Sequence, residues 1–135
     1  MPMLAELVDG VIGVDTHRDT LTAAAVNNLG GVLAQITTSA DAAGYRQLLD
    51  FANRHVAGRR LWAVEGAGSF GAGLTAILQQ HGERVVEVGR PKRPASRSGA
   101  KSDALDAVRA AREALSQNRR PAPAAAVSGR HYGRC

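Results

Sequence analysis

Residues 7–37, LVDGVIGVDTHRDTLTAAAVNNLGGVLAQIT, contain the clearest structural pattern of the chain. Its first apolar run, Leu7–Val14, has the length and composition of a buried strand. A second run covers Thr20–Asn28, and a third, Val32–Thr37, follows a Leu-Gly-Gly turn. Short turns between such runs predict three consecutive antiparallel strands.

Helices and strands alternate after this meander. Asp41 is placed to cap a helix that runs through Val56, because its carboxylate can accept hydrogen bonds from the first free amides. The elements expected beyond it are a strand, a glycine-rich turn, a helix ended by Gly82, a strand, and a helix capped by Ser102: Leu61–Val64, Gly66–Gly73, Leu74–His81, Val85–Val88 and 102–115. Three antiparallel strands followed by alternating helices and strands is the order of a ribonuclease H-like α/β fold with a mixed sheet.

Length and composition restrict the class of protein. With 135 residues, 44% hydrophobic and 21% charged, the chain is long enough for one domain with its own core, which we place at residues 1–117. Residues 118–135 lack an apolar period and are expected to be a disordered, aberrant tail. The lone cysteine, Cys135, excludes an internal disulfide, and the chain has no membrane-length apolar run or signal peptide. We therefore expect a cytoplasmic protein that does not bind a membrane.

The charge of the chain is unevenly distributed. Residues 1–66 carry a net charge of −2 and residues 67–135 a net charge of +7, which makes the total +5. Basic groups cluster in the segment 90–101, RPKRPASRSGAK, which contains no acid. We expect this mobile loop to bind nucleic-acid phosphates, and the alternative is a solvated linker. The residues concerned are Arg90, Lys92, Arg93, Arg97 and Lys101.

Four carboxylates occupy positions at which α/β proteins bind ligands. Asp15 and Glu65 each end a predicted strand, and parallel pairing of the two strands would place them side by side at one sheet edge. Asp103 and Asp106, three residues apart in the first turn of the last helix, project from one face. Carboxylates brought this close repel one another, and a divalent cation, Mg²⁺ or Mn²⁺, removes that cost. Two such ions, about 3.5–4 Å apart, support phosphodiester chemistry.

Each acid also has an ordinary structural explanation. Asp15 is a residue type that begins many turns, and Asp103 and Asp106 suit the positive end of a helix dipole. Glu65 lacks such a local reason, although a buried ion pair with an arginine would explain it. His17 is interpreted as a hydrogen-bonding turn residue rather than a metal or phosphate ligand.

At these residues the chain resembles the DEDD-type transposases of the insertion sequence 110 family. Three of their motifs are matched in order: Val11–Asp19 (VIGVDTHRD), Trp62–Gly71 (WAVEGAGSFG), and Arg90–Arg93 (RPKR) with Lys101–Ala107 (KSDALDA). The resemblance covers about residues 8–116. It implies an amino-terminal domain similar to the RuvC Holliday-junction resolvase.

The resemblance also implies a function. The metal-binding catalytic tetrad would be Asp15, Glu65, Asp103 and Asp106, acting on DNA in a transposase or site-specific recombinase, and some members use a structured guide RNA. The family's second domain, which carries a serine for strand exchange, has no recognisable counterpart in this sequence. We therefore expect a truncated copy that does not complete transposition by itself, with a homo-oligomer with full-length transposase left open.

Two other functions compete with a metal-dependent strand-processing domain. One is a non-catalytic remnant that holds DNA or structured guide RNA without cutting it, and metal-dependent nicking separates this function from the first. The other is a small ATPase similar to actin or sugar kinases, whose first strand also ends in an aspartate. That class needs a second nucleotide-clamping domain, which 135 residues do not accommodate.

Overall fold

The computed structural model of the chain describes residues 8–89 and 100–116, and within 100–103 it describes the helical backbone alone. The strands in these ranges are β1 (Gly10–Thr16), β2 (Thr20–Asn27), β3 (Val32–Ser39), β4 (Arg60–Glu65) and β5 (Val85–Val88). They form one sheet in the order β3-β2-β1-β4-β5. Pairing is antiparallel between β1, β2 and β3, whereas β4 runs parallel to β1 and β5 runs parallel to β4. The predicted mixed sheet, with its antiparallel meander, is confirmed.

The turn between β2 and β3 is built from local side-chain chemistry. The Asn27 side-chain oxygen accepts hydrogen bonds from the backbone N–H groups of Leu29 and Gly31, both at 2.9 Å. Gly30 between them has φ of 88°, a left-handed conformation that glycine adopts without steric cost. The chain therefore reverses tightly and returns β3 against β2.

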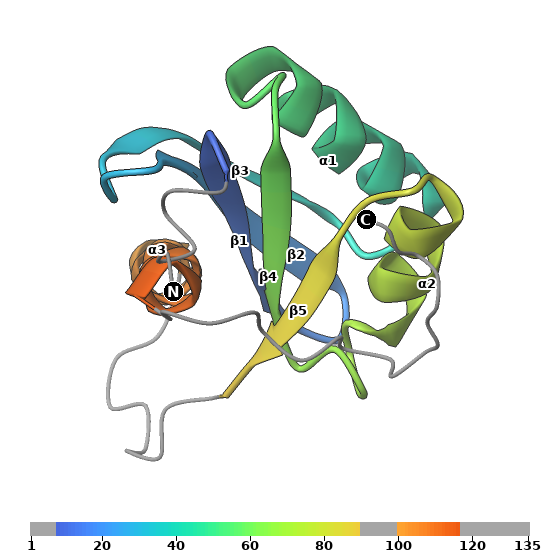
Figure 1. Cartoon of the computed structure of the whole chain (residues 1–135). Helices are drawn as coiled ribbons and strands as arrows, with labels where there is room; N and C mark the ends of the chain where they lie inside the picture. Colours follow the sequence, from blue (N-terminus) through green and yellow to red (C-terminus); the bar gives the residue numbers. More distant parts are fainter. Residues whose placement is uncertain (1–7, 90–99, 117–135) are drawn as a thin grey trace.

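Three helices of the described residues cover the two faces of the sheet: α1 (Ala42–His55), α2 (Ala72–Gln80) and α3 (Ala100–Ser116). Figure 1 shows α1 and α2 on one face and α3 on the other. The predicted cap of α1 is confirmed, because the Asp41 carboxylate accepts the N–H of Gly44 at 2.9 Å. The sheet is thus buried on both sides, which explains why β1 and most of β2 and β4 are buried along their length.

Alternation along β1 and β4 decides which side chains meet which helix. Val14 and Val64 belong to the core shared with α1 and α2, whereas Ala63 belongs to the core shared with α3. Successive side chains of a strand point to opposite faces. The same alternation sends Asp15 and Glu65 to the α3 face, at the end of the two strands where the apolar contacts stop.

Helix α3 lies unusually close to β1 because both surfaces are small. A Cβ atom added to Gly13 would lie 2.1 Å from the carbonyl oxygen of Ala107 and 2.8 Å from the amide nitrogen of Ala111. Four buried alanines at helical spacing lie on the contact face of α3: Ala107, Ala110, Ala111 and Ala114. This close approach brings the first half of α3 to the end of β1 that carries Asp15.

Two of the boundaries that differ from the sequence-based expectation affect the position of the acids. Strand β1 continues through Thr16, so Asp15 lies inside the strand and does not begin a turn. Helix α3 begins at Ala100, so the prediction that Ser102 caps it is wrong, and Asp106 lies beyond its first turn. The sequence before Ser102 contains helix-favouring alanine and lysine, which allow the helix to start earlier.

Other expectations fall on parts of the chain that the structure does not describe. The basic segment at 90–101 lies outside the described residues, except for helical backbone at 100 and 101, and so does the tail at 118–135. Within residues 8–89 and 100–116, every helix is too short or too polar to cross a bilayer.

Candidate functional site

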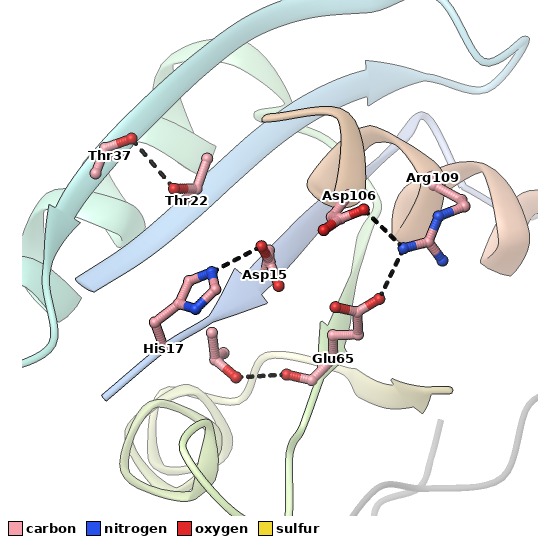
Figure 2. A network of polar contacts seen from close by, with 8 residues as sticks. Asp15, His17, Thr22, Thr37, Glu65, Asp106 and Arg109 are labelled. Atoms are coloured by element: carbon pink, nitrogen blue, oxygen red, sulfur yellow. Dashed lines mark hydrogen bonds and ion pairs between the residues drawn. The ribbon is translucent and has the colours of Figure 1, made fainter. Parts of the chain in front are cut away.

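Asp15 and Glu65 form a buried acidic pair at the carboxyl ends of β1 and β4. The two residues are direct partners in the parallel register, and each is only 1% exposed. Figure 2 shows both side chains on the side of the sheet that carries Asp106 and Arg109 of α3. The expected juxtaposition of the two strand ends is therefore observed, and parallel register is its cause.

The backbone around Glu65 is held by specific hydrogen bonds. The hydroxyl of Thr16 donates to the Glu65 carbonyl oxygen at 2.6 Å, which ties the ends of β1 and β4 together. Gly66 follows with φ of 75°, and its carbonyl oxygen accepts the amide hydrogens of Ser69 at 2.9 Å and Gly71 at 2.8 Å. A left-handed glycine here lets the chain turn away directly after the carboxylate. The glycine-rich turn thus leads into α2 while leaving Glu65 at the strand end.

Burial changes the acidity of the pair. Removal from water raises the pKa of Glu65 from 4.5 to about 7, assisted by its hydrogen bond to Asp15 and by the Asp15 charge, while Arg109 acts in the opposite direction. Burial also raises the pKa of Asp15, although hydrogen bonds to Glu65 and His17 partly oppose the rise. Placing two ionised carboxylates at this position therefore costs free energy, and a cation bound between them would offset that cost.

Helix α3 contributes a third acid and a counter-charge. Arg109 donates from Nη2 to the Glu65 Oε2 at 3.2 Å and to the Asp106 Oδ1 at 3.0 Å. The spacing of three residues places Asp106 and Arg109 on one helix face. The Asp106 charge is also close enough to raise the pKa of Asp15. A single guanidinium nitrogen therefore links the end of β4 to α3 above the acidic pair (Figure 2).

The donor set suits a hard divalent cation. Asp15, Glu65 and Asp106 offer carboxylate oxygens, the ligands that Mg²⁺ prefers, and the two buried acids gain from added positive charge. Among the described residues, however, no three acidic, histidine or cysteine side chains are already gathered tightly enough to hold a metal. The chemistry of these residues fits a divalent cation.

Two further polar contacts flank Asp15. His17 Nε2 lies 3.0 Å from the Asp15 Oδ2, which agrees with the expected hydrogen-bonding histidine. On the other side Thr22 is the antiparallel partner of Asp15, and its hydroxyl lies 3.2 Å from that of Thr37 on β3. Polar side chains therefore continue from Glu65 on β4 across β1 and β2 to β3 at one level of the sheet.

The structure does not describe the side chains of the remaining residues of the predicted site. Asp103 belongs to α3, three residues before Asp106, and its side chain is not described. The same holds for Lys101 in the predicted basic loop, and the other members of that loop precede the helix: Arg90, Lys92, Arg93 and Arg97.

Arg109 is the residue of this site that sequence reasoning missed. Glu65 does form an ion pair with an arginine, although that partner is 39% exposed, and it comes from a helix 44 residues further along the chain. The available signal was the spacing from Asp106, which places an arginine one helical turn after an acid on the same face. Thr22 gave no comparable signal, because only the strand register places it opposite Asp15.

Fold and site together define the class of protein. The chain is an α/β domain of the ribonuclease H-like type, with a buried carboxylate pair at the carboxyl ends of its two central parallel strands. Among solved structures it is similar to RuvC of Thermus thermophilus, with a TM-score of 0.52 and 12% sequence identity over 81% of this chain and 99% of that one. The RuvC-like fold is therefore established, and the acids are placed in it by register.

The family follows from the sequence. Residues 12–128 match the model of the DEDD transposases of insertion sequence 110, described as a transposase. The match spans most of the chain, so this chain belongs to that transposase family and is a DNA strand-processing domain of RuvC-like fold. It extends beyond residue 117, where the domain was expected to end. A comparison with curated protein sequences finds no match.

Proposed function

We propose that Asp15, Glu65, Asp103 and Asp106 bind divalent cations, Mg²⁺ or Mn²⁺, and that the domain uses them for phosphodiester chemistry on DNA. The observation that carries this proposal is the in-register pair of buried acids, Asp15 and Glu65, whose pKa values burial raises. A buried pair of acids lowers the stability of the folded chain, and the binding of a cation would explain why the pair is present.

The residues of the site have distinct tasks in this proposal. Asp15 and Glu65 are fixed by the sheet, and the Thr16 hydroxyl holds the end of β4 beside β1. Asp106 approaches from α3, and Asp103 precedes it by three residues on the same helix. Bound cations would activate a water or hydroxyl nucleophile and stabilise the leaving oxygen. The strand ends therefore supply two of the proposed ligands, and α3 supplies the other two.

The partner we propose is DNA, with a structured guide RNA as a second nucleic acid. Family membership supports DNA, and the charge of +7 on residues 67–135 supports a polyanion. Arg90, Lys92, Arg93, Arg97 and Lys101 precede the two aspartates of α3 in the chain, so phosphates bound by them would lie near the carboxylates.

A second function is favoured by a specific contact. Arg109 already pairs with Glu65 and Asp106, at 3.2 and 3.0 Å, and thereby neutralises part of the acidic cluster without a cation. A domain stabilised in this way could bind nucleic acid without cutting it. Cleavage and binding must therefore be measured separately.

The test incubates the purified chain with branched and linear DNA in the presence of Mn²⁺. We expect metal-dependent nicking that is lost in Asp15→Asn and retained in Asp50→Asn. Asp50 is an exposed residue of α1, which lies on the sheet face opposite to α3, so its substitution makes the same chemical change away from the site. Nicking that survives Asp15→Asn would refute the assignment, and DNA binding without nicking would favour the non-catalytic function.

A further inference from the structure

Arg109 contacts two of the proposed metal ligands with the same atom. Its Nη2 lies 3.2 Å from the Glu65 Oε2 and 3.0 Å from the Asp106 Oδ1, so one nitrogen joins carboxylates from β4 and α3. Guanidinium groups do not lose their proton in proteins, so this charge is present at every accessible pH. Two of the carboxylates that would coordinate a cation thus already bind a permanent positive charge.

The position of Arg109 allows it to leave. Its side chain is 39% exposed, whereas the Glu65 side chain is 1% exposed. The carboxylate is therefore fixed in the protein interior, and the guanidinium lies at the rim, where water can replace its contacts. A buried acid with a movable basic partner differs from a closed buried ion pair, in which both groups are enclosed.

We propose that Arg109 is a positioning residue that competes with the divalent cation for Glu65 and Asp106. In this arrangement the guanidinium holds the two carboxylates together and lowers the affinity of the site for metal, and metal loading turns the side chain outward. The inference rests on the metal-binding role proposed above for these acids. In this proposal Arg109 lowers the metal affinity of the site, whereas a residue that only held the carboxylates in place would raise it.

The test measures Mn²⁺ binding to the full chain by isothermal titration calorimetry. Removal of the competing charge in Arg109→Gln should tighten Mn²⁺ binding about tenfold, because a like charge within contact distance opposes cation binding. The matched control is Arg112→Gln on the same helix. Arg112 is exposed and its Nε bonds the Gly30 carbonyl oxygen at 2.9 Å, so this change should alter the affinity by less than about twofold.

The outcomes separate this inference from the proposed function. Mn²⁺ binding that is unchanged or weaker in Arg109→Gln, with the wild-type chain binding normally, overturns the competition and makes Arg109 a brace. Failure of both proteins to bind Mn²⁺ overturns the metal site and the competition together.

A second measurement follows Arg109 in the wild-type chain itself, and a variant serves only to assign its signal. The Nε–H signal of Arg109 in the ¹⁵N NMR spectrum of the wild-type chain is assigned by its loss in Arg109→Lys and followed during titration with Mg²⁺. We expect the Arg109 signal to move toward the position of a solvated arginine while the Arg112 signal stays in place. An Arg109 signal that is unmoved at saturating Mg²⁺ overturns the proposal.

Discussion

Glu65 places a carboxyl group at the end of a strand whose other side chains are mostly apolar, and burial raises its pKa to about 7. Its partner Asp15 is equally buried, and burial raises the pKa of Asp15 as well. Glu65 is therefore partly protonated near neutral pH. At the scale of single residues, the site is a balance between burial, which favours the proton, and Arg109, which favours the charge.

The pH dependence of stability follows from this balance. Between pH 4.5 and about 7, folded Glu65 keeps a proton that it loses in the unfolded chain, so the free energy of unfolding falls as the pH rises through this window. The contribution amounts to at most roughly 3 kcal/mol for Glu65, and Asp15 acts in the same direction. Glu65→Gln should flatten the slope in urea denaturation between pH 5 and pH 8 with EDTA present.

The control for this measurement is Glu87→Gln. Glu87 is an exposed residue on the neighbouring strand β5, so its replacement by Gln makes the same chemical change outside the site. If the slope for Glu65→Gln is as steep as the slope for Glu87→Gln, the Glu65 carboxyl is not the proton-binding group.

At the scale of elements, the decisive contact is that of α3 with β1. Alanines at the centre of the contact face and a glycine on the strand let the helix come close to the sheet. The helix also binds the β2–β3 turn through the Arg112 contact with the Gly30 carbonyl oxygen. The packing of these small residues determines how closely α3 approaches β1, and hence whether Asp106 and Arg109 reach the strand ends.

Gly13→Ala tests this contact. Its new Cβ would lie 2.1 Å from the Ala107 carbonyl oxygen, so either α3 or β1 must move. We expect a loss of about 2 kcal/mol or more in the free energy of unfolding, typical of overpacking, even though alanine suits a strand better than glycine. Urea denaturation measures the effect.

Gly68→Ala is the matched control, because a Cβ at Gly68 meets no atom within 4 Å. It should leave the stability nearly unchanged. Equal stability of the two variants would contradict the close approach of α3 at Gly13.

At the scale of the whole molecule, the first and second halves of the chain differ in net charge. The first 66 residues are net negative and contain the buried acids Asp15 and Glu65, whereas the rest is strongly positive. A polyanion attracted by the second half would be guided toward an acidic centre only if cations or arginines neutralise that centre. Nucleic-acid binding and metal binding are therefore expected to be linked in this domain.

Salt dependence measures the contribution of the basic segment. Replacement of Lys92, Arg93 and Arg97 by Ala should weaken DNA binding at low salt and reduce the slope of log K against log[salt] by about 2–3, because each lost phosphate contact releases roughly one counterion fewer. Fluorescence anisotropy with a labelled duplex at several salt concentrations gives the slope.

The control removes three exposed arginines elsewhere, Arg46, Arg54 and Arg84, so that the net charge changes equally. A slope that changes as much in this control as in the loop variant would mean that only net charge matters. An unchanged slope in the loop variant would identify the segment as a solvated linker.

The sequence alone determined the order of elements, the antiparallel meander and the cap at Asp41, because apolar periodicity, turn glycines and capping act between residues close together in the chain. It also identified Asp15 and Glu65 as acids at adjacent strand ends, and the family to which the motifs belong. Local patterns were insufficient at Ser102, where helix propensity on both sides outweighed a capping residue. Asp103 and the basic loop stay predictions.

Which side chains meet depends on how the whole chain folds. The parallel register of β1 and β4 places Asp15 directly beside Glu65, and a slip of one residue would have sent one of them to the opposite face. The packing of α3 against Gly13 delivers Arg109 to Glu65 across 44 residues of chain. Such contacts depend on the summed packing of distant segments, and no local pattern around Glu65 or Arg109 encodes them. The charge balance of the site is therefore a property of the folded chain.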